Sequence, residues 1–212
     1  MYTGTARSRA DAQAIANAFA QEVARVRGTP LAPPPTVQVR NTPQLIFFRG
    51  DSNQVVVPWW DTAPPGMRSI FTTFAGGDAA AGEQLFRAFF NRFNIAHEMG
   101  HWFMARAGRR EATQYDAENM ANRWAVAFWR TQPDGERYLA MLEQMAARAA
   151  DNLTDPTPAG QDPATYFGAN YQALGREPLK YGYYQFRFTR DALRDRAQLD
   201  FAQMVRDPQA GR

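Results

Sequence analysis

The stretch His97-Glu98-Met99-Gly100-His101 contains both histidines of this 212-residue chain. A spacing of four residues is about one helical turn, so both imidazoles are expected on one face of a helix. Two imidazoles placed in this way can bind one tetrahedral zinc ion, and a glutamate beside the first can act as general base on a zinc-bound water. The pattern therefore predicts a catalytic zinc site with His97 and His101 as ligands and Glu98 as the base.

The surrounding sequence predicts a buried helix over residues 83–106. Apolar side chains precede and follow the motif, and no proline interrupts these residues, so the helix is apolar nearly all round. Gly100 lowers helix propensity, and we expect its missing side chain to permit the close approach of another element. In the alternative interpretation, both histidines are ordinary core residues, but this does not explain why the rest of the chain has none.

The composition indicates one compact domain over residues 1–212, since 45% of the residues are hydrophobic and 13% are aromatic. The net charge is only +3, and no basic run is suited to following a phosphate backbone, so we expect no nucleic-acid partner. The chain has no cysteine, which excludes disulfides and thiolate metal ligands.

The sequence leaves the cellular compartment open between two interpretations. No apolar run reaches the ~18 residues of a membrane span, and residues 1–9 lack the apolar core of a signal peptide. The protein is therefore either cytoplasmic or the mature form of an exported protein whose signal has been removed. We prefer the exported form, periplasmic or secreted. The oligomeric state is not predicted.

The N-terminal part of the chain, residues 8–75, is predicted to contain a helix and a small sheet. The helix covers residues 8–27 and is capped by Ser8 and Asp11. Short strands are predicted in stretches rich in β-branched and aromatic residues, at 36–40, 44–48 and 54–58, with a fourth candidate at 68–74. Within the fourth, residues 69–74 are a candidate for an edge strand that pairs with an extended substrate, and an ordinary edge strand is the alternative.

The C-terminal part, residues 113–207, is predicted to form a helical lobe. Capping residues and apolar spacing predict helices at 113–130, 134–150, 162–175 and 189–207. Residues 176–188 are rich in tyrosine and are interpreted as irregular.

A third zinc ligand must be a carboxylate, because the chain has no further histidine and no cysteine. The helix expected after the motif carries Asp116 and Glu118, and Glu111 lies just ahead of it. We choose Glu118, because Asp116 is expected to cap the helix. Asn122, one turn after Glu118, is placed to accept a hydrogen bond from a liganding imidazole. Asp116 remains the competing candidate.

The stretch Glu118-Asn119-Met120-Ala121-Asn122 resembles the E-x-x-A-N/D pattern that follows H-E-x-x-H in compact bacterial gluzincins, including the ImmA/IrrE-like and related metallopeptidase families. The resemblance covers about residues 93–128. The extended metzincin motif is absent, since Ala107 stands where that class has a histidine.

This resemblance implies a fold and an activity. The fold is α+β, a minimal zincin-like fold in which a small mixed sheet packs on the H-E-x-x-H helix and a helical lobe follows. The resemblance places one zinc ion per chain on His97, His101 and Glu118. The implied activity is that of a zinc metallopeptidase, in which Glu98 activates a zinc-bound water that attacks a peptide or protein substrate.

The tetrahedral oxyanion formed in such a reaction needs a donor, and no third histidine is present to supply it. Tyr181 and Tyr183 are the leading candidates, together with Tyr184, and Arg187 is a cationic alternative. In the competing interpretation, each tyrosine packs its ring in the core and exposes its hydroxyl to water.

Two functions of other classes remain as alternatives. One is a regulatory or binding protein that keeps a zincin scaffold without peptidase activity. The other is a structural protein with a fortuitous motif, against which Glu98 argues, because a structural zinc site has no use for a general base.

Overall fold

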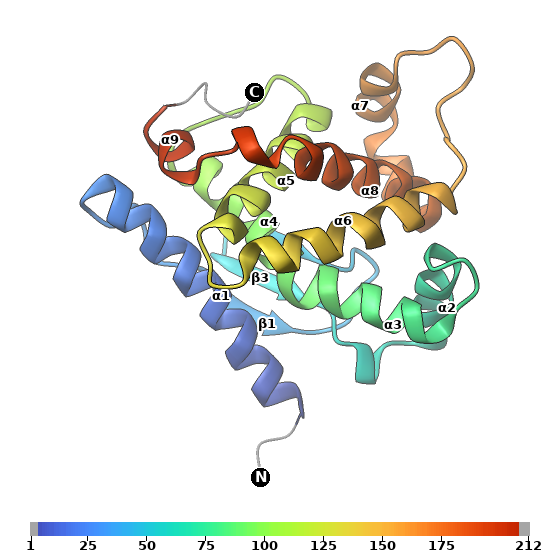
Figure 1. Cartoon of the computed structure of the whole chain (residues 1–212), viewed down its shortest axis with the longest axis horizontal. Helices are drawn as coiled ribbons and strands as arrows, with labels where there is room; N and C mark the ends of the chain where they lie inside the picture. The colour runs from blue at the N-terminus through green and yellow to red at the C-terminus, as the bar shows by residue number, and fades with distance from the viewer. Residues whose placement is uncertain (1–3, 208–212) are drawn as a thin grey trace.

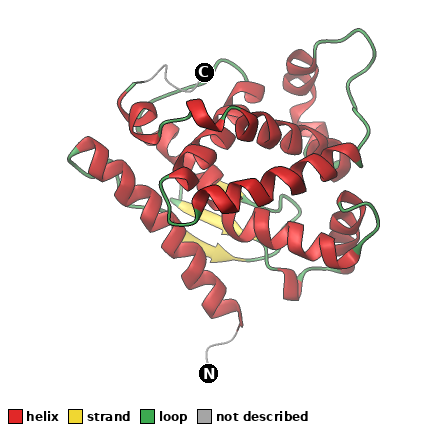
Figure 2. Ribbon diagram, in the orientation of Figure 1, coloured by secondary structure: helices red, strands yellow, loops and turns green. Residues whose placement is uncertain are grey.

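The computed structural model describes residues 4–207, and helices predominate over one three-stranded sheet in this part of the chain (Figures 1 and 2). This confirms the α+β class in its general form. The expected domain also included residues 1–3 and 208–212, which lie outside the described residues. None of the described helices has the length and apolarity needed to cross a membrane.

The sheet consists of β1 (Thr36–Val39), β2 (Phe47–Arg49) and β3 (Gln54–Val57), in the order β1-β3-β2. β1 is parallel to β3, whereas β2 and β3 form an antiparallel hairpin. The first three predicted strands are therefore present, each shorter than expected. β2 is an edge strand beside the helix that carries the histidine motif.

The first helix, α1 (Gly4–Arg27), packs on β1 and begins before the predicted cap. Ser8 and Asp11 both lie within this helix and not at its start, so the capping roles predicted for them are wrong. Phe19 and Val23, one helical turn apart, are fully buried and belong to the apolar face of this helix.

Residues 68–74 form helix, which contradicts the predicted fourth strand. They belong to α2 (Pro65–Phe74), which follows a short 3₁₀ turn, η1 (Trp60–Thr62). Pro65 is well suited to the first helical turn, and Phe71 and Phe74, three residues apart, are both buried. The proposed substrate-pairing strand at residues 69–74 is therefore excluded.

The motif helix is one helical run with a π turn in the middle. It consists of α3 (Ala79–Ala88), the π turn η2 (Phe89–Phe93) and α4 (Asn94–Arg106). Tyr138, from α6 (Gly135–Asp151), donates its hydroxyl to the Ala88 carbonyl at 2.7 Å and lies within reach of the Phe93 N–H. The Tyr138 hydroxyl thus contacts the backbone of the wider turn and helps to hold it, and no local sequence pattern predicts this contact.

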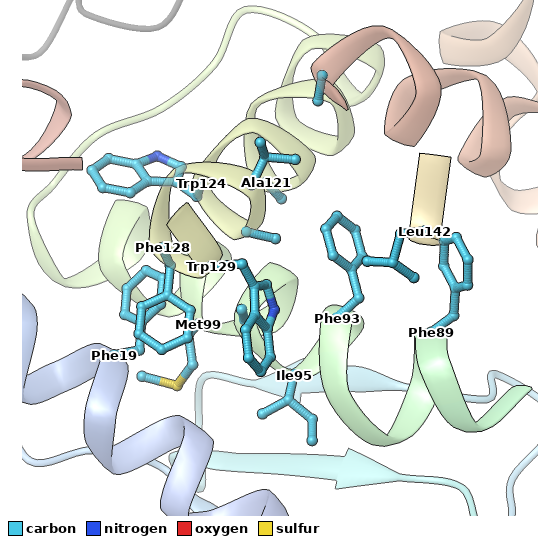
Figure 3. Packing of buried hydrophobic residues seen from close by; sticks show 14 of the residues in the cluster. Phe19, Phe89, Phe93, Ile95, Met99, Ala121, Trp124, Phe128, Trp129 and Leu142 are labelled. Carbon is cyan, nitrogen blue, oxygen red and sulfur yellow. The ribbon is translucent and has the colours of Figure 1, made fainter. Parts of the chain in front are cut away.

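The next helix, α5 (Gln114–Arg130), packs closely on α4. A Cβ atom at Gly100 would lie 2.9 Å from Trp124 Cβ and 3.3 Å from Ala121 Cα, which confirms that Gly100 permits a close approach. Figure 3 shows part of the core around these helices, with Phe19 against Phe128 and Phe93 near Leu142.

The C-terminal part contains α7 (Pro163–Leu174), α8 (Pro178–Arg194), the 3₁₀ turn η3 (Arg196–Gln198) and α9 (Phe201–Arg206). In Figure 1, α8 runs beside α6. The interpretation of residues 176–188 as irregular is wrong, because α8 covers most of them. The predicted helix at 189–207 is divided between the end of α8, η3 and α9. Gly182 has low helix propensity, so the sequence around it does not indicate a helix. A glycine is needed at this position, because a Cβ atom there would lie 2.7 Å from the Phe74 ring.

Candidate metal centre

Three side chains converge between α4 and α5. The Nε2 atoms of His97 and His101 are 3.1 Å apart, and Glu118 Oε2 lies 3.3 Å from the first and 3.9 Å from the second. The histidines come from successive turns of α4, and the glutamate comes from α5. These are the three residues predicted as ligands, and the structure brings them into one group that can hold a metal ion.

Asp116, the competing candidate, lies outside this group. Its backbone N–H donates to Thr113 Oγ1 at 3.1 Å, and the Thr113 hydroxyl donates to its carboxylate at 2.8 Å. Asp116 thus takes part in capping the N-terminus of α5, as the sequence indicated.

The distances within the group suit a small metal ion. In a tetrahedral zinc site with bonds of 2.0–2.2 Å, neighbouring ligand atoms are about 3.4 Å apart. Glu118 and His97 are both buried, and a buried carboxylate requires a partner of opposite charge. Two imidazole nitrogens and one carboxylate oxygen are a donor set for zinc and for other first-row divalent ions.

The electrostatic environment shifts the pKa values of the two carboxylates, Glu118 and Glu98, in opposite directions. Burial opposes ionisation of Glu118, but the hydrogen bond and charge of His97, together with His101, lower its pKa to about 2. Burial raises the pKa of Glu98 to about 7, and the nearby Glu118 adds to this shift. Burial also lowers the pKa of His101 to about 4, which favours the neutral imidazole that a metal requires.

Glu98 is held by the edge of the sheet. Its Oε2 atom accepts a hydrogen bond of 2.7 Å from the backbone N–H of Phe48 in β2. The strand beside the site is therefore β2. Glu98 and the three grouped residues line a cavity of about 620 Å³, which is also lined by residues 43–48 and by parts of α7 and α8.

The candidate oxyanion donors occupy different places. Tyr181 lines the cavity, and its hydroxyl is hydrogen-bonded to that of Tyr171. The structure does not bring Tyr183 to the cavity, because its hydroxyl donates to Asp155 at 2.9 Å. Tyr184 shares a hydrogen bond with Thr157, and Arg187 faces Tyr183 and Asp155.

Two residues at the site were missed by the sequence analysis. The Tyr171 hydroxyl donates to Glu118 Oε1 at 3.0 Å, and Gln185 Nε2 donates to Glu118 Oε2 at 2.9 Å. The spacing of Tyr181 and Gln185 would have placed them on one helical face, had residues 176–188 been interpreted as helix.

Asn122 lies near His97, but the predicted hydrogen bond from the imidazole is not formed, because the buried His97 Nδ1 has no hydrogen-bond partner among the described residues. The Asn122 Oδ1 atom instead accepts a hydrogen bond of 2.8 Å from the Thr189 hydroxyl of α8. Its Nδ2 donates to the backbone carbonyl of Glu118 at 2.9 Å. Asn122 therefore links the grouped residues to α8.

Comparison of the chain with protein-family models, curated protein sequences and solved structures gave no match.

Proposed function

We propose that the protein is a zinc-dependent metallopeptidase of the gluzincin type with a minimal zincin-like fold. The observation that carries the proposal is the placement of Glu98, whose carboxylate borders the same cavity as the group formed by His97, His101 and Glu118. Three protein ligands and a neighbouring general base are the parts that metal-assisted peptide hydrolysis needs.

In this proposal, His97, His101 and Glu118 hold one zinc ion per chain. Zinc, when bound, supplies the Lewis acidity that activates a water molecule and polarises the scissile carbonyl. Glu98 accepts the proton of the attacking water and delivers it to the leaving amine. Burial raises the pKa of Glu98 in the metal-free protein, and a raised pKa favours a carboxylate that takes up a proton near neutral pH.

The substrate is a peptide or protein that enters the cavity in an extended form. β2 is the edge strand at the cavity, so a peptide beside it can bond to the main-chain groups of this edge other than the Phe48 N–H, which Glu98 already occupies. Tyr181 is the tyrosine of the predicted group that lines this space, and we assign it the role of oxyanion donor, for which its hydroxyl turns from Tyr171 to the substrate.

The test combines metal content with peptide cleavage. Purified protein is analysed for zinc by mass spectrometry, beside the variants His101→Ala, Glu118→Ala and Glu98→Gln. We expect about one zinc per chain in the wild type, loss of zinc in the first two variants and retention in the third. Glu98→Gln should lower the cleavage rate of a peptide library by roughly 10²- to 10⁴-fold, as loss of a general base does.

Wild-type protein that binds no zinc after supplementation would contradict the proposal. Zinc binding without cleavage of any peptide would instead support a regulatory or binding protein built on the same scaffold.

A further inference from the structure

Glu118 is fixed by two side chains from helices remote in the sequence. Tyr171 of α7 donates to its Oε1 atom at 3.0 Å, and Gln185 of α8 donates to its Oε2 atom at 2.9 Å. Glu118 itself is only 6% exposed. Each oxygen of this buried carboxylate therefore has a defined partner.

The two oxygens face different surroundings. Oε2 is the atom that lies 3.3 Å from His97 Nε2 and 3.9 Å from His101 Nε2. A carboxylate oxygen has two lone pairs, so the hydrogen bond from Gln185 leaves one pair of Oε2 free toward the histidines. Oε1 is engaged by the Tyr171 hydroxyl instead.

We propose that Tyr171 and Gln185 are positioning residues that make Glu118 a single-oxygen metal ligand, with Oε2 presented to the metal and Oε1 held away from it. This inference rests on the metal site of the proposed function. One oxygen and two nitrogens give three protein ligand atoms, which leaves one position of a tetrahedral site for the reaction.

Neighbouring contacts hold both positioning residues in place. The Tyr171 ring packs against Phe167 and Tyr181, with ring centroids 5.5 and 6.2 Å apart. One turn after Gln185, the Thr189 hydroxyl donates to Asn122 of α5 at 2.8 Å. α8 is thus joined to α5 at two successive turns, and the Gln185 amide is aimed at Glu118.

The experiment measures zinc affinity of metal-free protein by competition with a chelator. We expect Tyr171→Phe and Gln185→Met each to weaken zinc binding by 10- to 100-fold, the usual effect of removing a hydrogen-bond partner of a ligand. Tyr183→Phe removes the same hydroxyl from a tyrosine that bonds Asp155 outside the cavity, so it should bind zinc as the wild type does. Gln172→Met is the matched control for Gln185, since Gln172 lines the cavity without a hydrogen bond to Glu118 among the described residues.

Cobalt in place of zinc provides a readout of the coordination mode. Cobalt in the wild type should show the strong visible absorption of a four-coordinate ion. Tyr171→Phe frees Oε1 to reach the metal, so its cobalt spectrum should be weaker and shifted toward that of higher coordination. Circular dichroism of each variant verifies that the fold is retained.

Wild-type affinity in both Tyr171→Phe and Gln185→Met, with unchanged cobalt spectra, would overturn this inference and leave the proposed function intact. A wild type that binds zinc and cleaves no peptide would overturn the proposed peptidase activity, while the affinities of the variants would still decide the roles of Tyr171 and Gln185. A wild type that binds no zinc would overturn both.

Discussion

Gly100 determines how closely α4 and α5 approach, and this distance sets the position of Glu118 relative to the histidines. A methyl group at this position would meet Trp124 Cβ at 2.9 Å, and a Cβ atom cannot rotate away. Overpacking of this kind costs about 1–3 kcal/mol, and the better helix propensity of alanine offsets up to about 1 kcal/mol. We expect Gly100→Ala to lower the free energy of unfolding by about 1–2 kcal/mol and to weaken zinc binding, measured by urea denaturation and chelator competition.

Gly168 provides the matched control for this change. It lies in α7 and is exposed, and a methyl group added there would have no neighbouring atom within 4 Å. Gly168→Ala should therefore raise the free energy of unfolding by about 0.5–1 kcal/mol. Equal effects of the two substitutions would show that Gly100 has no special role in packing.

The π turn between α3 and α4 depends on a side chain from α6. Tyr138 is buried, and its hydroxyl donates to the Ala88 carbonyl at 2.7 Å. Tyr138→Phe would remove this buried hydrogen bond, which contributes about 0.5–1.5 kcal/mol. We expect a lower free energy of unfolding of this size, measured by urea denaturation.

The control for this substitution is Tyr183→Phe. The Tyr183 hydroxyl bonds the exposed Asp155, so its removal should change the free energy of unfolding by less than about 0.5 kcal/mol. An equally small effect of Tyr138→Phe would mean that the π turn is stable without the Tyr138 hydroxyl.

Elements with a local start signal could be predicted from the sequence. Asp78, Thr113 and Asp162 each accept backbone hydrogen bonds at the start of a helix. Residues 68–74 favour a strand by composition, because Ile70 to Thr73 are β-branched or aromatic, but Pro65 at the first turn and the burial of Phe71 and Phe74 favour the helix α2. The sequence does not indicate α8, because this helix is stabilised by packing, including Phe74 against Gly182, and not by helix propensity.

The part of the candidate site that lies on α4 and α5 could be predicted from the sequence, because these two helices could be predicted. His97, Glu98, His101 and Glu118 lie on helices that the sequence indicated, and the structure groups them around one cavity. The groups contributed by β2, α7 and α8 could not be predicted, because no local pattern reports which distant backbone N–H or side chain will face a buried carboxylate.

At the scale of the whole molecule, metal binding should stabilise the fold, because the ligands join α4 to α5 in the core. A ligand present at 100 times its dissociation constant stabilises the native state by about 2.7 kcal/mol. For a chain of this size, this corresponds to a rise in Tm of roughly 5–10 °C. We expect this rise when zinc is added to metal-free protein and its reversal by a chelator, measured by thermal denaturation.

Two controls belong to this measurement. Magnesium prefers oxygen ligands in octahedral geometry, so it should not raise Tm. His101→Ala should also abolish the effect of zinc. A similar rise with zinc in His101→Ala would place the stabilising metal at another site.

The three grouped side chains all lie between residues 97 and 118, whereas Tyr171 and Gln185 come much later in the chain. During synthesis on the ribosome, the potential ligands therefore emerge well before the helices that orient Glu118 and close the cavity. A metal ion captured by the nascent α4–α5 hairpin would still lack these orienting hydrogen bonds. The complete centre, with a selective geometry, is thus a late product of folding that requires the C-terminal part of the chain to dock.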